Sequence, residues 1–126
     1  MEPVTLGDHL RNRRLDLGLL QEEAATKLGV SSDTVRGWEN NRHEPAIRHV
    51  PRILEFLGYV PFEPGPSLTE RFRFARWTRG LSKRAMAARL GVDETTVRDW
   101  ERGVHRPSRR NRDRLDALLV SRTNDR

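Results

Sequence analysis

Basic side chains gather in the second half of the chain, in a pattern suited to binding a polyanion. Residues 63–126 hold sixteen lysines and arginines against nine acidic residues, whereas residues 1–62 hold eight against nine. Cations that neutralise phosphates release condensed counterions, so clustered Lys and Arg favour nucleic-acid binding. The asymmetry predicts that the second half makes the stronger contact with a phosphate backbone. The basic residues around its central motif are Lys83, Arg84, Arg102, Arg106, Arg109, Arg110 and Arg112.

The residue pattern supports no other chemistry. The 126 residues include no cysteine, which excludes disulfides and thiolate metal ligands. His43 and His105 have no further ligands at metal-binding spacing, so we interpret them as phosphate contacts or structural hydrogen-bonding residues. No nucleophile–base pattern or glycine-rich phosphate loop occurs, and we expect no catalysis, cofactor or metal. The alternative explanation of the net charge of +6 is a merely soluble basic surface.

Membrane and export signals are not found in the sequence. No apolar run approaches the roughly 18 residues of a membrane span, and the N-terminus lacks the apolar region of a signal peptide. We therefore expect a bacterial-type cytoplasmic protein that associates with the nucleoid and not with a membrane.

The elements that would position these cations begin with residues 21–39, which predict a helix, a tight turn and a second helix. Ala24 and Leu28, four residues apart, give the first helix an apolar face. Gly29 follows where a helix end needs a residue that tolerates positive φ. Ser31 is a suitable N-cap for the second helix. Two short helices joined in this way are typical of a helix-turn-helix.

The motif occurs twice. A shift of 62 aligns residues 6–45 with 68–107 without a gap, and sixteen of the forty positions are identical. Most retained residues are turn glycines and apolar side chains, so the repeat indicates fold before function. Trp38 and Trp100 could stack on bases, but each lies three residues after a retained valine, and we expect both in the core.

The domain organisation follows from this repeat. Residues 58–67 contain three prolines and two glycines, which predicts a linker of some stiffness. We therefore expect an all-α chain with one domain at 1–57 and a strongly basic one at 68–120, followed by a tail at 121–126 that frays. Aromatic residues inside the linker, Tyr59 and Phe62, indicate that it packs against a domain.

Each copy resembles the Cro/CI (Xre-type) helix-turn-helix family. The shared pattern is an Arg in helix one, Leu-x-Gln at the start of helix two, Ala-x-x-Leu-Gly-Val, Val-x-x-Trp-Glu and a Pro after a polar loop. It corresponds to Arg14, 19–21, 25–30, 35–39 and Pro45, and to Arg76, 81–83, 87–92, 97–101 and Pro107. The sequence departs from the pattern where Leu20 replaces the usual capping Ser and Lys83 replaces the usual Gln. The resemblance implies two tandem lambda-repressor-like bundles of about five short helices each.

The resemblance also implies where DNA would be bound. The family uses the start of helix two, the exposed face of helix three (here about 32–40 and 94–102) and the following loop. The candidates in the first copy are Gln21, Ser31, Ser32, Asp33, Thr34, Arg36, Gly37, Asn40, Asn41 and Arg42. Those in the second copy are Lys83, Arg84, Glu94, Thr95, Thr96, Arg98, Asp99, Arg102, Arg106, Arg109 and Arg110.

The residue types on the exposed faces of the third helices are compatible with base contacts and with other roles. Arg36 and Arg98 could bind guanine O6 and N7, but they could equally be solvated charges or phosphate contacts. Glu94 and Asp99 are repelled by phosphates unless they accept from a cytosine amino group. Whether the second copy reads bases is therefore undecided.

Two ion pairs are implied by the resemblance. In the family, an Arg of helix one pairs with the Glu that ends helix three, here Arg14 with Glu39 and Arg76 with Glu101. A bidentate pair would fix the geometry of the bundle, although its net stabilisation is small. The alternative is that these arginines contact DNA phosphates.

The leading hypothesis is a sequence-specific double-stranded DNA-binding protein, a transcriptional regulator that acts as a monomer on an asymmetric site or as a homodimer. The alternative is an antitoxin-like adaptor in which one repeat, the neutral first one, docks a partner protein while the other binds DNA. We expect no small-molecule ligand, because the two domains leave no residues for a separate sensing domain.

Overall fold

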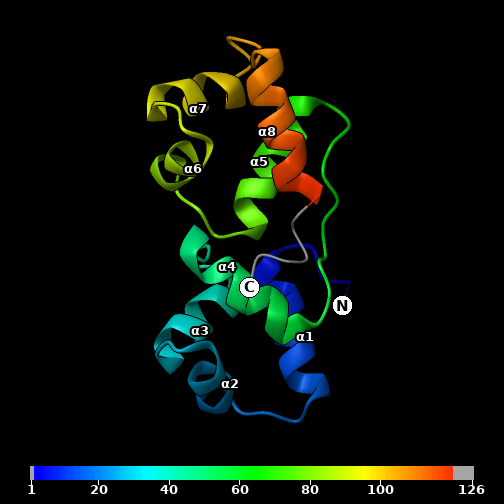
Figure 1. The fold of residues 1–126 in the computed structure, drawn as a ribbon. Coiled ribbons are helices and arrows are strands. Elements are labelled where there is room, and N and C mark those ends of the chain that lie inside the picture. The colour runs from blue at the N-terminus through cyan, green and yellow to red at the C-terminus, as the bar shows by residue number, and fades with distance from the viewer. Residues whose placement is uncertain (1, 121–126) are drawn as a thin grey trace. The chain divides into compact units, whose positions relative to one another are not determined.

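The computed structural model describes residues 2–120, and all regular structure in this part is helical (Figure 1). The chain divides into two compact units between Phe62 and Glu63. The first unit contains α1 (Leu6–Asp16), α2 (Gln21–Leu28), α3 (Ser32–Glu39), the 3-10 turn η1 (Ile47–His49) and α4 (Val50–Leu57). The second contains α5 (Leu68–Thr78), α6 (Lys83–Leu90), α7 (Glu94–Glu101) and α8 (Arg109–Val120).

The predicted fold class, all-α with two tandem helix-turn-helix bundles, is confirmed. Only the first unit has a fifth helical element among the described residues, the turn η1. No helix in the described range is long and apolar enough to cross a membrane. The tail that was expected to fray, residues 121–126, lies outside the described residues.

Local sequence accounts for the helix ends. Thr5 and Asp8 form a capping box, in which the Asp8 amide donates to Thr5 Oγ1 (3.0 Å) and the Thr5 amide donates to Asp8 Oδ2 (3.2 Å). Ser31 caps α3 by accepting from the Thr34 amide at 3.1 Å. Gly29 ends α2 at a φ of 72°, a left-handed conformation that most other residues would adopt with strain.

Each unit closes on a core from all of its α-helices. The Trp38 and Trp100 side chains are 3% and 5% exposed, so both lie in the core, as predicted. The other fully buried large side chains of the first unit are Leu10, Val35, Val50, Ile53 and Leu57. Those of the second unit are Phe72, Met86, Val97 and Leu115.

The first part of the predicted linker packs on α1. His9 Nδ1 and the Tyr59 hydroxyl are 2.8 Å apart, and the His9 ring meets both Tyr59 and Phe62 edge-on, with ring centroids 5.7 Å apart in each case. Gly58, at a φ of 80°, ends α4 and turns the chain toward these contacts.

Candidate nucleic-acid interface

A buried ion pair sets the geometry of the first helix-turn-helix. Arg14 Nε and Nη2 donate to the two carboxylate oxygens of Glu39 at 2.7 and 2.8 Å, and Nη1 donates to the Leu19 carbonyl at 2.8 Å. The hydrogen bond to Glu39 raises the pKa of Arg14. One guanidinium thus joins α1, the turn before α2 (at Leu19) and the end of α3. Because its donors are engaged within the protein, Arg14 has little left for a DNA phosphate.

The second unit repeats this arrangement. Arg76 Nε and Nη2 donate to Glu101 at 2.6 and 3.0 Å, and Nη1 donates to the Leu81 carbonyl at 3.0 Å. Arg73 on the same helix donates to the Glu101 carbonyl. The recognition helix α7 is therefore fixed to α5 at its C-terminal end, as α3 is fixed to α1.

The start of helix two differs between the units. In the first, Leu20 is 62% exposed and its amide donates to Glu23 Oε1 at 2.8 Å, so a carboxylate occupies the helix N-terminus. In the second, Ser82 caps α6 by accepting from the Ala85 amide at 3.0 Å. Lys83 then opens α6, where the backbone amides of a helix N-terminus favour phosphate. The α6 N-terminus therefore suits an anion, whereas that of α2 already holds one.

Gln21, which was predicted to contact DNA, is partly engaged inside the protein. Its Nε2 donates to Glu39 Oε1 at 3.1 Å. It therefore supports the buried ion pair, and one amide hydrogen remains to be donated to a phosphate. The side chain of its counterpart Lys83 has no hydrogen bond or ion pair in the described part of the chain.

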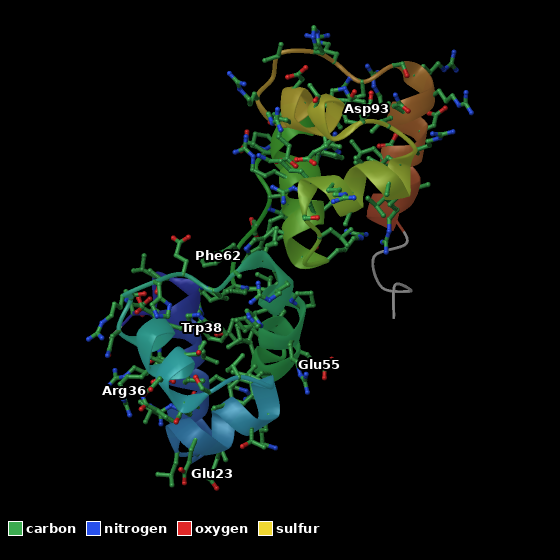
Figure 2. All side chains as sticks on the ribbon, turned by 90° about the vertical axis from the view of Figure 1, so that its left-hand side faces the viewer. Glu23, Arg36, Trp38, Glu55, Phe62 and Asp93 are labelled. Atoms are coloured by element: carbon green, nitrogen blue, oxygen red, sulfur yellow. The ribbon has the colours of Figure 1, made fainter. Side chains whose placement is uncertain are left out.

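The recognition helix of the first unit presents Arg36 outward. Arg36 and Glu23 lie at the surface of this unit, whereas Trp38 lies within the bundle (Figure 2). Arg36 Nη1 forms an ion pair with Asp33 Oδ1 at 2.9 Å, one turn earlier on the same face. The Thr34 hydroxyl is 2.9 Å from that of Ser31. Ser32 is half-buried beside this exposed pair.

The recognition helix of the second unit has a similar exposed pair. Arg98 Nη2 lies 3.6 Å from Glu94 Oε2, and both side chains are nearly half exposed. Asp99 Oδ2 is 3.9 Å from His105 Nε2 in the following loop. Thr95 is exposed, and Thr96 is half-buried. Each recognition helix therefore pairs one exposed arginine with one carboxylate, and the second also carries Asp99.

Two positions expected to face DNA make contacts within the protein, one of them buried and the other exposed. Gly37 is buried, and a Cβ there would lie 2.2 Å from His43 Nε2, because the imidazole covers it. Asn41, at a φ of 58°, donates from Nδ2 to Asp8 Oδ1 at 2.9 Å and accepts from the Thr5 hydroxyl at 2.6 Å. The His43 side chain, over Gly37, and the Asn41 side chain therefore hold the loop after α3 against the bundle.

The hydrogen bonds of Asp8 have an electrostatic consequence. The Asn41 side chain and the Val4 and Thr5 amides lower its pKa from 3.8 to about 2. The loop after α3 is thus held by a group that remains ionised well below neutral pH. The neighbouring candidates Asn40 and Arg42 stay exposed.

The loop after α7 and the start of α8 carry exposed cations. Among residues 2–120, none of their guanidinium groups has a hydrogen bond or ion pair, so all are available to a polyanion. These residues are Arg102, Arg106, Arg109 and Arg110.

A pair of arginines with a structural role was missed by the sequence reasoning. Arg114 Nη1 donates to the Leu90 carbonyl at 2.6 Å, and it would lie 3.0 Å from a Cβ at Gly91. Arg52 lies at the same distance from a Cβ at Gly29. Both arginines cover the turn of their helix-turn-helix. Their spacing of 62 residues was the available signal, but it falls outside the aligned stretch.

An outward-facing helix after a tight turn, braced by a buried Arg–Glu pair and repeated in one chain, defines a helix-turn-helix DNA-binding protein. Residues 10–64 match the family described as helix-turn-helix, and residues 67–120 match a second one, described as helix-turn-helix domain. The chain belongs to the Xre-type helix-turn-helix family of DNA-binding regulators.

A relative in Methanothermobacter thermautotrophicus is named as an uncharacterized HTH-type transcriptional regulator. It is 39% identical over 49 residues, which cover 39% of this chain and 71% of the relative. No solved structure was found to match the chain.

Proposed function

We propose that the chain is a sequence-specific double-stranded DNA-binding transcriptional regulator that places α3 and α7 in the major groove. The observation that carries this proposal is the set of uncommitted cations around α7, at the start of α6, in the following loop and on α8. Each phosphate that these cations neutralise contributes about 0.9 to the slope of log affinity against log salt. The second unit would thus supply most of the phosphate binding.

The ion pairs on the recognition helices are weak enough to be exchanged for base contacts. An exposed pair such as Arg36 with Asp33 contributes about 0.2–1 kcal/mol. A bidentate contact from Arg36 or Arg98 to guanine would contribute about 1–3 kcal/mol of discrimination. The free energy of the base contact is therefore larger than that of the ion pair that it replaces. The released carboxylates of Asp33 and Glu94 could then accept from a cytosine amino group.

The two recognition faces differ, which bears on the symmetry of the DNA site. Ser32, Asp33 and Gly37 in the first unit correspond to Glu94, Thr95 and Asp99 in the second. A covalent link supplies the second module at high effective concentration, so a partner chain is not needed for two contacts. We therefore propose an asymmetric site bound by one chain.

In vitro selection from random duplex DNA tests this function. We expect a consensus with two dissimilar parts, one relaxed by Arg36→Ala and the other by Arg98→Ala. A perfectly palindromic consensus would mean that two chains bind as a homodimer, against the proposal. If the selection recovers no consensus sequence, the protein binds DNA non-specifically and the proposed sequence specificity is wrong.

A second candidate function is favoured by the surface of the first unit. Leu15, Leu17 and Leu20 are exposed around the turn from α1 to α2, and Glu22 and Glu23 follow in the first turn of α2. This apolar and acidic surface suits a protein partner with basic and apolar side chains better than it suits phosphate. If Arg36→Ala and Asn40→Ala leave the selected sequence and the affinity unchanged, the first unit would be a protein-docking module.

A further inference from the structure

The second unit contains a cleft of about 670 Å³ beside its recognition helix. It lies between the N-terminus of α5, the end of α7 with its loop, and α8. Its partly exposed apolar lining residues are Leu68 and Pro107, and behind them lie the buried side chains of Phe72 and Trp100, whose rings meet edge-on at 5.7 Å. Its volume falls in the range of about 300–1,000 Å³ that is usual for small-molecule sites.

The first unit shows why this cleft is open. Gly7 on α1 has no side chain, and a Cβ there would lie 2.0 Å from the Trp38 carbonyl oxygen, so α1 and α3 are in direct backbone contact. The corresponding residue on α5 is Thr69, whose hydroxyl donates to the Trp100 carbonyl at 3.2 Å. A side chain therefore stands between α5 and α7 where none separates α1 from α3.

The loop after the recognition helix differs in the same way. In the first unit, the Asn41 side chain spans from the loop to Thr5 and Asp8 at the N-terminus of α1. The corresponding residue is Gly103, at a φ of 73° and with nothing within 4 Å of an added Cβ. The second unit thus lacks the side chain that covers this position in the first.

The start of the last helix completes the contrast. Val50 is fully buried at the start of α4, and the His49 ring lies against Trp38 with ring centroids 5.3 Å apart. The counterpart of Val50 is Arg112, an exposed residue that lines the cleft. An apolar side chain that fills the first core is therefore replaced by a cation at the cleft.

The charges around the cleft favour an anion. Arg71, Arg106 and Arg112 line it, are exposed, and have no hydrogen bond or ion pair from their side chains among the residues described. His105 also lines the cleft, as does one carboxylate, that of Asp116. Three arginines against one acid leave a net positive rim over an apolar interior.

We propose that this cleft binds a small organic anion with an apolar body, such as an aryl or alkyl carboxylate or phosphate monoester. The apolar body would lie against Leu68 and Pro107, which cover the Phe72 and Trp100 rings, and the anionic group would be bound by the arginines of the rim. This replaces the expectation from sequence that no small molecule binds. Since Arg106 is also a proposed phosphate contact, occupancy would lower DNA affinity, a consequence that rests on the proposed function.

Binding is tested on the full chain without DNA, so the result does not depend on the proposed function. The probes are phenyl phosphate, inorganic phosphate and phenol, followed by amide chemical shifts and titration calorimetry. We expect phenyl phosphate to bind more tightly than either fragment and to shift the amides of Phe72, Trp100 and Gly103. Equal affinity for phenyl phosphate and inorganic phosphate would overturn the proposal.

Two variants link binding to the cleft. Gly103→Asn restores the side chain that occupies this position in the first unit, where Asn41 adopts the same left-handed backbone, and it should weaken phenyl phosphate binding about tenfold or more. Arg71→Gln should weaken it roughly tenfold, by removing one charge-assisted hydrogen bond. Arg11→Gln, an exposed arginine on α1, is the matched control and should change nothing. Unchanged binding in Gly103→Asn, with the fold retained by circular dichroism, would contradict a ligand site in this cleft.

Discussion

The first and second units share their turn glycines, buried tryptophan and Arg–Glu pair, but they differ at the start of helix two. In the first, Leu20 is exposed and Glu23 binds the Leu20 amide. In the second, Ser82 caps the helix and Lys83 follows. The shared residues are those that the bundle needs to fold, and the differing ones lie where a ligand would be bound. The repeat thus separates structural requirements from binding chemistry within one chain.

The largest expected effect concerns what the units share. Glu39→Ala and Glu101→Ala should each lower the free energy of unfolding of their unit by about 3–5 kcal/mol, because each leaves a buried arginine without its carboxylate. Glu39→Ala should cost more, since Glu39 also accepts from Gln21 at 3.1 Å. Urea unfolding followed by tryptophan fluorescence measures both. Removal of an exposed acid, Glu22→Ala, is the control; a similar small loss in all three variants would show that the pairs are dispensable.

The next effect concerns where the units differ. Replacing Leu20, Gln21, Glu22 and Glu23 by Ser, Lys, Arg and Ala gives the first unit the helix-two start of the second. The reciprocal variant carries Ser82→Leu, Lys83→Gln, Arg84→Glu and Ala85→Glu. We expect the first exchange to strengthen DNA binding and the second to weaken it about 100-fold at low salt.

Electrophoretic mobility shift on the selected DNA measures the two exchanges. Circular dichroism should show unchanged helix content, because both starts occur naturally in this chain. If both exchanges leave the affinity unchanged, the helix-two N-termini do not contact phosphate, and the contrast between the units lies elsewhere.

A smaller effect separates base reading from phosphate contact on the recognition helices. Arg36→Lys and Arg98→Lys keep the charge but lose the bidentate geometry. If each arginine reads a guanine, its Lys variant should lose about 1–3 kcal/mol of discrimination at one base pair while non-specific affinity is retained. Competition binding with single-base variants of the site measures this. An unchanged base preference in both would assign these arginines to phosphates or to solvent.

The smallest effect is a pH dependence confined to the first unit. The pKa of Asp8 is about 2 in the fold and 3.8 otherwise. A group whose pKa is lowered by folding stabilises the fold above its unfolded value, and this contribution is lost as pH falls toward the folded value. Stability should therefore fall between about pH 4 and pH 2, and Asp8→Asn should reduce this dependence. A wild-type pH profile in Asp8→Asn would show that the Asp8 bonds contribute nothing.

Most of the fold could be predicted from sequence, because local signals specify it. Gly29 indicates where the first helix of the motif ends, and Ser31 indicates where the second begins. The spacing of Trp38 from Val35 predicts that Trp38 lies in the core. The repeat added that these residues are retained in a second copy. The all-α architecture followed from such short-range signals.

The functional surface was less predictable, because it depends on contacts distant in sequence. Asn41 is exposed, yet its side chain also binds Thr5, 36 residues away, a contact that no local sequence signal indicates. The cleft could not be predicted, since it arises where Thr69, Gly103 and Arg112 replace residues that close the first unit. Alignment of the two copies shows these replacements. Only the three-dimensional structure shows that the three positions lie around the same cleft.

The central claim, that the second unit carries most of the DNA-phosphate contact, is tested most directly by the salt dependence of binding. The variant Arg109→Gln/Arg110→Gln/Arg112→Gln is compared with Arg11→Gln/Arg42→Gln/Arg48→Gln, which removes three exposed arginines from the first unit. We predict that the first variant weakens binding to all sequences and lowers the log–log salt slope by about 2–3, whereas the second lowers it by less than about 1. Equal slopes in the two variants, or a slope unchanged from wild type in the first, would contradict the claim.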